Sequence, residues 1–278
     1  MRDLEEIKRV QEINRKILNE IARVCKKYGI CYYLDCGALL GAVRHHSFIP
    51  WDDDVDISFT RTEYERFEKV IEKEWKDSNF LLHKPEDFLN DKWLDFIVRI
   101  IDTSEMVDIK LYDKVGKEAA SNIWNRPGID VFILDCVPDD PKCQKKLCRL
   151  MTIDYGLALG HRYSIDYQEY RGVEKIVVWI LSHLGKMFSV KTIVNRYRAH
   201  CTKYRDCEGD YYFYSNFSLK DIKKRNKREW YQGGTEVYID GDVYNAPVNY
   251  HEVLKMNYGD YMKLPPEHER VLKHVRNL

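Results

Sequence analysis

The segment PWDDDVDISF, residues 50–59, places four aspartates within five consecutive positions at the start of an apolar run. From Asp54 onward, acidic and apolar residues alternate with the period of a β-strand. On such a strand Asp54 and Asp56 project from one face, and Val55 and Ile57 project from the other. The fold must therefore bury the apolar face of this strand while it holds like charges together on the opposite face.

The two carboxylates of this D-x-D pattern repel each other, and burial would raise their pKa. A divalent cation removes that cost, and hard oxygen ligands suit Mg²⁺ or Mn²⁺ while leaving coordination positions for phosphate oxygens. The alternative is a solvated acidic loop in which aspartates cap a turn. The apolar neighbours Trp51, Val55, Ile57 and Phe59 favour the strand over the solvated loop.

A second acidic strand is predicted in GIDVFILDCVP, residues 128–138, where Asp130 lies near the start of an apolar run. A charge inside such a run requires a partner or a metal ion. Asp135 falls on the other face by the strand period, so it is not expected to join Asp130. If this strand neighbours residues 54–59, Asp130 completes a site with three carboxylates, which suits in-line transfer at phosphorus.

A helix opened by glycine is predicted upstream of the acidic segment. CYYLD, residues 31–35, predicts a short buried strand, and GALLGAVR, residues 37–44, predicts the helix. The backbone N–H groups of Gly37 and Ala38 at the start of this helix suit a phosphate. Arg44 at its end has two interpretations, a salt bridge to the aspartate run and a contact to phosphate oxygens.

The order of elements predicts an α/β (α+β) fold. Strands and helices alternate up to residue 137, which indicates a core with a mixed sheet, and mostly helical patterns follow. The simplest organisation is one unit over residues 1–278, with a core at 1–138 and a largely helical part at 139–278. Further helices are expected at 2–28, at 62–75 with Thr60 as its cap, within 141–208 and at 249–257, and further strands near 79–82, 94–101 and 211–217 with a hairpin in 235–248.

Charge and hydropathy argue against several classes of protein. The chain of 278 residues has 45 Lys and Arg against 45 Asp and Glu, so its formal net charge is zero. This balance argues against general electrostatic binding to nucleic acid. The chain contains no run of about 18 apolar residues, so no membrane-spanning helix is predicted. The N-terminus MRDLEEIKRVQEIN lacks the apolar centre of a signal peptide, so a cytoplasmic location is expected.

The eight cysteines form no C-x-x-C pair and show no spacing of paired metal ligands. Reduced thiols are therefore expected in preference to a zinc site. Tyrosine is frequent, with 20 residues, and is expected to supply much of the aromatic packing in the core.

These blocks resemble a known family. YYLDCGALLGAVRHHSFIPWDDDVDISF, residues 32–59, resembles the signature of the LicD phosphotransferase family, to which fukutin and fukutin-related protein are related. Residues 128–138 resemble the later acidic strand of that family, and YNAPVNYHEVLKMNYGDYMKLPP, residues 244–266, resembles its C-terminal end. The similarity spans residues 20–266. The layout of strand, glycine turn, helix and D-x-D strand is that of the wider nucleotidyltransferase superfamily.

The resemblance implies a nucleotidyltransferase fold and an enzyme that transfers a substituted phosphate. The implied donors are CDP-linked alcohols such as CDP-choline or CDP-ribitol. The implied acceptors are hydroxyls of cell-surface glycans, such as lipopolysaccharide or teichoic acid, or of their lipid-linked precursors. Transfer of a nucleotide to a small molecule and a non-catalytic nucleotide-binding domain are the alternatives.

The resemblance also implies roles for single residues. Asp54, Asp56 and Asp130 would hold Mg²⁺ or Mn²⁺, and Asp130 would help to deprotonate the acceptor hydroxyl. That hydroxyl would attack the distal phosphate of the donor, and CMP would leave. Strand alternation would turn Asp53 away from these ligands.

Gly37, Arg44 and His45 match the phosphate-side segment of the family. The chain departs from the pattern at Ala38, where the superfamily prefers serine, and at Ser47, where the family often has glycine. The first departure removes a hydroxyl contact and the second makes a turn less flexible. Neither departure removes a metal ligand.

Several further segments carry weaker signals. Arg99 is interpreted as a member of an ion pair or as a phosphate contact. The basic run KKRNKR, residues 223–228, is expected to be solvated, with a polyanionic acceptor or anionic lipid as the alternative. The apolar segment 176–188 is expected to be a core helix, with a membrane interface as the alternative. The tyrosine-rich segment 211–214 is expected to pack in the core rather than to form one wall of a choline cage, and Asp260 is expected in a turn.

Overall fold

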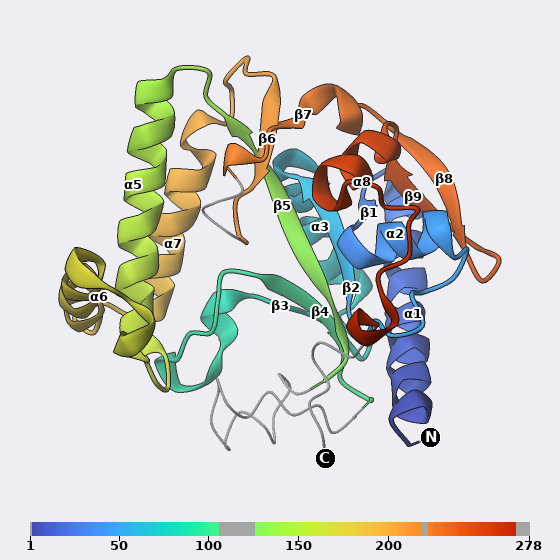
Figure 1. Ribbon diagram of the computed structural model, residues 1–278. Coiled ribbons are helices and arrows are strands. Elements are labelled where there is room, and N and C mark those ends of the chain that lie inside the picture. The colour runs from blue at the N-terminus through green and yellow to red at the C-terminus, as the bar shows by residue number, and fades with distance from the viewer. Residues whose placement is uncertain (1, 106–125, 218–221, 271–278) are drawn as a thin grey trace.

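The computed structural model describes residues 2–105, 126–217 and 222–270 (Figure 1). Its first elements are helix α1 (Arg2–Tyr28), strand β1 (Tyr33–Asp35), helix α2 (Cys36–Arg44), strand β2 (Val55–Thr60) and helix α3 (Arg61–Glu74). Gly29 ends α1 with a φ of +59°, a left-handed conformation that favours glycine. The Thr60 hydroxyl accepts a hydrogen bond from the Glu63 N–H and caps α3. These elements confirm the order predicted for the first part of the chain.

Strands β3 (Phe80–His83), β4 (Val98–Asp102) and β5 (Gly128–Val137) complete the centre of a mixed sheet in the order β1-β2-β5-β4-β3. The β2–β5 pair is parallel, and the β1–β2, β4–β5 and β3–β4 pairs are antiparallel. The second half of β5 also pairs with β6 (Tyr211–Tyr214), which pairs in turn with β7 (Asn226–Lys227). The mixed sheet with its helices confirms the α/β class.

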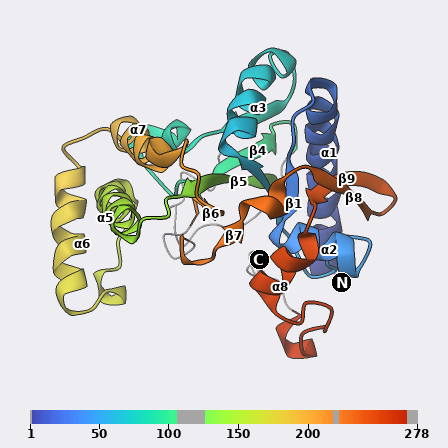
Figure 2. The same cartoon turned by 90° about the horizontal axis from the view of Figure 1, so that it is seen from above.

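Helices cover both faces of this sheet around β2. Figure 2 shows α1 and α3 on one side of the sheet and α2 on the other. The ring of Phe59 stacks on that of Phe67 in α3 with 5.0 Å between centroids, so the apolar side of β2 faces α3. By strand alternation, Asp56 projects from the opposite face, where α2 begins.

A second packed region follows β5. It contains helices α5 (Pro141–Ala158), α6 (Gly172–Gly185) and α7 (Val190–Cys201), with α5 packed against both of the others. Its core joins these helices to the segment before β4, where the rings of Phe96 and Tyr197 stack at 3.7 Å. The two hydrophobic cores of the molecule both include residues of β5 and β6.

The prediction of a largely helical part over residues 139–278 is not clearly confirmed, because helices dominate residues 141–204 and strands follow them. Strands β6 and β7 extend the main sheet, and β8 (Gly234–Ile239) and β9 (Asp242–Pro247) form the hairpin predicted within 235–248. Helix α8 (Tyr250–Tyr258) follows the hairpin. Short 3-10 turns link the elements at Pro85–Asp87, Leu89–Asp91, Leu159–His161, Tyr167–Glu169, Thr202–Tyr204, Arg228–Tyr231 and Glu267–Glu269.

The apolar helix α6 differs from its sequence-based interpretation. Val178, Ser182 and Gly185 are buried, but most of its large apolar side chains are exposed, so the prediction of a core helix is wrong for its outer face. Within the described ranges, no single helix has both the length and the hydropathy needed to cross a bilayer. Only the pair Gly172–Gly185 and Val190–Tyr204 meets that test jointly, with a bend of 119° between its members.

Candidate active site

Three aspartates and one arginine form a row across four adjacent strands. The sheet register pairs Asp35 with Asp56, Asp56 with Asp130, and Asp130 with Arg99. Residues paired across neighbouring strands project from the same face, so these four side chains share the face opposite Phe59. The hypothesis that the strand of Asp130 neighbours that of Asp56 is therefore confirmed.

The buried Asp56 carboxyl bears an electrostatic cost in this row. The residue is 8% exposed. Burial, and then repulsion by Asp54 and Asp130, raises the pKa of Asp56 well above its ordinary value. Asp35 and Asp52 add to the same effect. A cation bound among these carboxylates would offset that repulsion.

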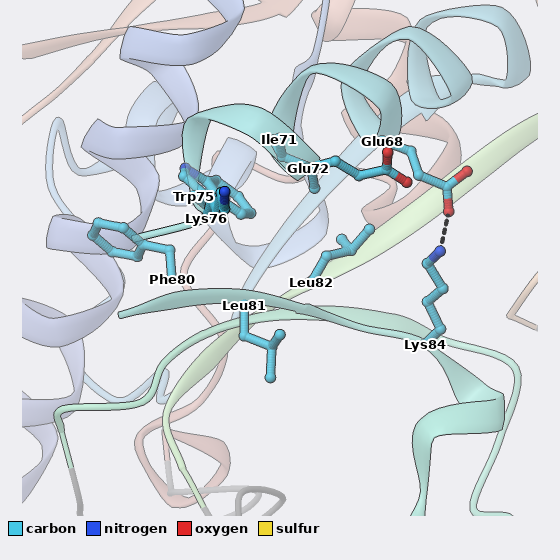
Figure 3. A pocket seen from close by; sticks show the side chains of 9 residues that line it. All are labelled: Glu68, Ile71, Glu72, Trp75, Lys76, Phe80, Leu81, Leu82 and Lys84. Carbon is cyan, nitrogen blue, oxygen red and sulfur yellow. Dashed lines mark ion pairs between the residues drawn. The ribbon is translucent and has the colours of Figure 1, made fainter. Parts of the chain in front are cut away.

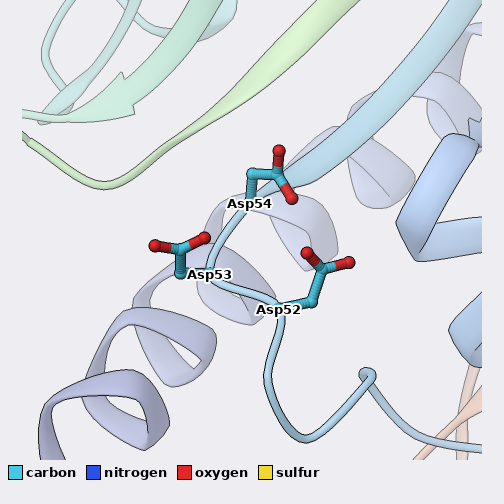
Figure 4. A group of neighbouring side chains, drawn as sticks. All are labelled: Asp52, Asp53 and Asp54. Carbon is cyan, nitrogen blue, oxygen red and sulfur yellow. The ribbon is translucent and has the colours of Figure 1, made fainter. Parts of the chain in front are cut away.

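The aspartates that precede Asp56 lie on a loop. Strand β2 begins at Val55, so Asp52, Asp53 and Asp54 do not follow its alternation. One carboxylate oxygen of each lies within 4.8 Å of the other two (Figure 4). The expectation that Asp53 turns away from Asp54 is therefore wrong. Among the described residues, this loop trio has the spacing of a shared metal site, and a metal site formed by Asp54, Asp56 and Asp130 stays a prediction.

Gly37 allows Asp52 to approach helix α2. A Cβ atom at Gly37 would lie 2.2 Å from Asp52 Oδ2, so any other residue would displace the carboxylate. Ala38, the next residue of the first turn, is buried. Gly37 thus positions a carboxylate of the aspartate loop, and its contact to phosphate stays a prediction.

Asp35 is a residue of this region that the sequence analysis missed. It is fully buried, and its carboxylate accepts hydrogen bonds from the Tyr214 hydroxyl and the Cys36 N–H, each at 2.8 Å. It caps α2, and an aspartate two positions before the predicted helix was the available signal. Cys36 has a φ of +43°, a left-handed conformation that is costly for a residue with a side chain. The chain is therefore strained next to the row.

Arg44 and His45 lie where α2 ends, beside the C-terminal segment. Arg44 Nη1 donates to the Tyr261 carbonyl at 2.9 Å, and Arg44 Nε donates to His45 Nε2 at 3.0 Å. The His45 ring packs edge-on against Trp51 with 5.9 Å between centroids. Burial, and then the charge of Arg44, lowers the pKa of His45. Arg44 thus holds a backbone carbonyl, a role that neither sequence interpretation included.

Arg99 pairs with two carboxylates at the end of the row. Its Nε lies 3.0 Å from Asp130 Oδ1, and its Nη2 lies 2.9 Å from Asp95 Oδ2. Burial opposes its charge, but Asp130 and Asp95 outweigh burial and raise the pKa of Arg99. The structure thus confirms that Arg99 forms ion pairs. A contact between Arg99 and phosphate stays a prediction.

Two residues from the second half of the chain reach the same region. Burial, together with neighbouring Cys36 and Asp35, raises the pKa of Tyr258 in α8. Burial also raises the pKa of the Cys36 thiol well above its ordinary value, and the charge of Lys224 opposes that rise. Lys224 belongs to the basic run interpreted as solvated, and it is exposed. Tertiary structure therefore brings a cation from a distant part of the sequence close enough to act on Cys36.

Asp135 lies apart from the row, as the strand period predicted. Arg61 donates to both of its oxygens, with Nε to Oδ1 at 3.0 Å and Nη2 to Oδ2 at 2.6 Å. Both side chains are largely buried, so this is an internal ion pair between β5 and α3.

A hollow between α3 and β3 is also separate from the row (Figure 3). Trp75, Phe80 and Leu82 line it, and an ion pair of 2.8 Å joins Lys84 to Glu68 at one end. None of the residues predicted for the active site is among those that line it.

The carboxylates of the row and the loop fit a hard divalent cation. The spacing of Asp52, Asp53 and Asp54 and the raised pKa of Asp56 are two separate observations in favour of a positive charge there. Oxygen ligands of this kind suit Mg²⁺ or Mn²⁺. The ligand atoms of the loop trio are carboxylate oxygens and not the thiolates typical of structural zinc sites.

Part of the first half of the chain matches a known protein family. Residues 29–132 match the family model described as LicD/FKTN/FKRP, nucleotidyltransferase domain. That range contains Asp35, Asp56, Arg99 and Asp130, and therefore the whole row.

The chain is also similar to individual transferases. It is 28% identical over 267 residues to the lipopolysaccharide cholinephosphotransferase LicD of Haemophilus influenzae, which covers 94% of this chain and 92% of that protein. It is 48% identical over 46 residues to ribitol 5-phosphate transferase FKRP of mouse and of human, covering 15% of this chain and 9% of each relative. Residues 29–132 are thus similar to the LicD/FKTN/FKRP nucleotidyltransferase domain, and nearly the whole chain is similar to one cholinephosphotransferase.

Proposed function

We propose that this protein is a metal-dependent phosphotransferase. It moves a substituted phosphate, with phosphocholine as the preferred case, from a CDP-linked alcohol to a hydroxyl of a cell-surface glycan or its lipid-linked precursor. The observation that carries the proposal is the row of Asp35, Asp56 and Asp130 in register beside the aspartate loop. The similarity to a lipopolysaccharide cholinephosphotransferase over 94% of the chain supports the same chemistry.

Mg²⁺ or Mn²⁺ would be held by Asp54, Asp56 and Asp130, with Asp52 and Asp53 beside them. When bound, the cation would neutralise charge on the phosphate oxygens of the donor. Asp35 would act indirectly, because it caps α2 and fixes the backbone that adjoins Asp56.

The proposed reaction is an in-line displacement at phosphorus. The oxygen of the acceptor hydroxyl attacks the distal phosphorus and forms a new P–O bond. The bond from that phosphorus to the bridging oxygen breaks, and CMP leaves with the electron pair. Asp130 accepts the proton of the hydroxyl, and its ion pair with Arg99 orients the carboxylate.

Groups on the α2 side would bind the donor phosphates. The N–H groups of Gly37 and Ala38 would supply positive charge at the start of α2, and the ammonium of Lys224 would add to it near Cys36. Arg44 and His45 would support this wall by holding the Tyr261 carbonyl. Residues 1–278 would act as one catalytic unit on the cytoplasmic side of the membrane.

The relatives support phosphocholine over ribitol phosphate. The cholinephosphotransferase aligns with 94% of the chain, whereas the ribitol 5-phosphate transferases align with 15%. Residues that select the alcohol lie outside the metal-binding motif in this proposal, so the longer alignment is the better guide.

The test is a screen for CMP release from CDP-choline, CDP-ribitol, CDP-glycerol and CDP-ethanolamine with Mg²⁺ or Mn²⁺. We expect the fastest release from CDP-choline and a loss of about 10³-fold or more in Asp56→Asn and Asp130→Asn, because each removes a charge needed in the transition state. Asp77→Asn is the matched control, since Asp77 is exposed in the turn after α3. Equal activity in Asp56→Asn and Asp77→Asn would refute the proposal.

The mass of the modified acceptor separates the two possible transfers. Addition of phosphocholine supports attack at the distal phosphorus. Addition of CMP with loss of phosphocholine would instead identify a nucleotidyltransferase, the alternative function. Tight binding of CDP-choline without release of either product would identify a binding domain.

A further inference from the structure

Helix α6 exposes large apolar side chains at the outer edge of the molecule. Figures 1 and 2 both show α6 beyond α5, on the side away from the main sheet. Val173 is 76% exposed, Ile176 is 59% exposed and Trp179 is 53% exposed. Ile180 and Leu184 are exposed as well. Single exposed apolar residues need no explanation, but a group of this size on one helix indicates an interaction surface.

The helix is apolar on two opposite sides. Its inner side packs closely on α5, since a Cβ atom at Gly185 would meet the Leu157 carbonyl oxygen. Ile176, Ile180 and Leu184 recur at a spacing of four residues, so they share the outer face. A helix that is apolar all round is normally buried in protein or in lipid. The outer face of α6 therefore requires an apolar partner.

Exposed cationic residues occur on α6, at both of its ends and at the start of α7. Arg171, Lys175, Lys186 and Lys191 are all exposed, and Glu174 is the single carboxylate between residues 171 and 191. The chain as a whole has no net charge, so this excess is local. Lysine stems lie along apolar surface while their ammonium groups reach anionic headgroups, and tryptophan favours the same boundary.

A second copy of the chain fits this face poorly. A helix of 14 residues is about 21 Å long, and at about 10 Å wide it presents about 200 Å², against about 800 Å² per partner in a stable interface. Two copies would also bring their lysines together, and like charges across an interface are unfavourable. The same helix is shorter than the bilayer core, which is about 30 Å thick. It can therefore lie in the plane of the membrane surface but cannot cross the bilayer.

We infer that α6 docks in the plane of an anionic lipid membrane. Val173, Ile176, Trp179, Ile180 and Leu184 enter the boundary between headgroups and acyl chains, and the flanking cations contact the headgroups. This assignment does not depend on the proposed transfer reaction. It would hold the catalytic sheet beside the membrane, where a lipid-linked acceptor lies.

Co-sedimentation with phospholipid vesicles tests the inference on the full chain. We expect pelleting with vesicles of phosphatidylcholine and phosphatidylglycerol, and weak pelleting with phosphatidylcholine alone. The variant Ile176→Ser with Ile180→Ser should lower the partition coefficient about tenfold or more, because two buried apolar side chains are lost. Lys175→Gln with Lys186→Gln should reduce the preference for phosphatidylglycerol.

The matched control is Tyr238→Ser with Val243→Ser. These two residues are similarly exposed and are paired on the β8–β9 hairpin, far from α6 in Figure 1. Pelleting that is absent in the wild type, or equal in the α6 variant and this control, would overturn the inference. Dimerisation that the α6 variant abolishes, measured by light scattering, would also overturn it in favour of a second copy.

CMP release measured without lipid separates this inference from the proposed function. We expect the Ile176→Ser, Ile180→Ser variant to keep wild-type CMP release, since neither residue lies near the carboxylates. Membrane binding without any CMP release would refute the transfer reaction and leave the docking surface standing. CMP release without membrane binding would refute the docking surface and leave the transfer reaction standing.

Discussion

Asp56 and Asp130 are direct partners in the register of the parallel strands β2 and β5, so two carboxylates lie side by side on one face of the sheet. The pKa of Asp56 is raised by burial and by its neighbours Asp54 and Asp130. The folded protein thus favours the neutral form of this carboxyl, and the unfolded chain does not. This relationship has a measurable effect on stability.

We expect Asp56→Asn to stabilise the metal-free protein while abolishing turnover. The pKa of Asp56 is raised in the folded state, so its neutral carboxyl contributes to stability at low pH. That contribution is complete below the pKa of the unfolded state, about 3.9, and is lost as pH rises through the pKa of the folded state. The wild type with EDTA should therefore lose stability as pH rises from about 4 towards neutrality, and Asp56→Asn should lose less. At pH 7 Asp56→Asn should raise the free energy of unfolding by about 1 kcal/mol, which corresponds to about 2–4 °C in Tm. Thermal unfolding against pH measures it, and an unchanged pH profile would contradict the argument.

Gly37→Ala should fold but lose activity, because the new methyl group would displace the Asp52 carboxylate from α2. We expect a loss of about tenfold or more in kcat/KM, equivalent to about 1.4 kcal/mol. The double variant with Asp52→Ala tests the cause. If Asp52 transmits the effect, Gly37→Ala adds little further loss once that carboxylate is absent.

Arg44→Ala should release the C-terminal segment, because it removes the hydrogen bond to the Tyr261 carbonyl. We expect faster proteolysis between residues 258 and 270 and a higher KM for the donor with a smaller change in kcat. Arg23→Ala is the control, since Arg23 makes half-exposed ion pairs on α1 that contribute little. Equal proteolysis of both variants would show that Arg44 does not hold this segment.

Arg61→Met should destabilise the protein by about 3–5 kcal/mol, because it leaves the buried Asp135 carboxylate without its cation. The double variant Arg61→Met with Asp135→Leu should recover most of that loss. Denaturant unfolding measures both. Metal binding by the double variant should match the wild type, since Asp135 lies apart from the row.

Removal of metal by EDTA should abolish CMP release, and Mg²⁺ or Mn²⁺ should restore it. The carboxylate ligands favour these ions, because hard divalent cations prefer oxygen donors to the thiolates that zinc often takes. Elemental analysis of the purified protein checks this directly. Tightly bound zinc at one equivalent would contradict the assignment of oxygen ligands.

Local pattern in the sequence was sufficient for most elements of the fold. The helix over 2–28, the cap at Thr60, the acidic strand and the hairpin near 235–248 all depend on neighbours within a few residues, and the structure confirms them. The separate faces of Asp130 and Asp135 also followed from strand alternation alone, because successive side chains of a strand point to opposite faces.

Predictions from the sequence pattern were wrong where backbone conformation or distant packing determines the orientation or burial of a side chain. Alternation did not apply to Asp53, because β2 starts only at Val55 and the preceding residues form a loop. Helix α6 has the composition of a core helix, but only one of its sides meets α5, and no local signal shows how much surface the rest of the fold can cover.

The sequence by itself determined most of the secondary structure and the acidic residues of this protein, because both depend on side-chain period and residue type. Tertiary structure alone decided which carboxylates are neighbours. Asp35, Asp56 and Asp130 meet because β2 lies between β1 and β5, and Lys224 approaches Cys36 from a segment that is almost 190 positions away. Contacts of that kind depend on the pairing order of strands and on the packing of whole elements, which no window of neighbouring residues contains.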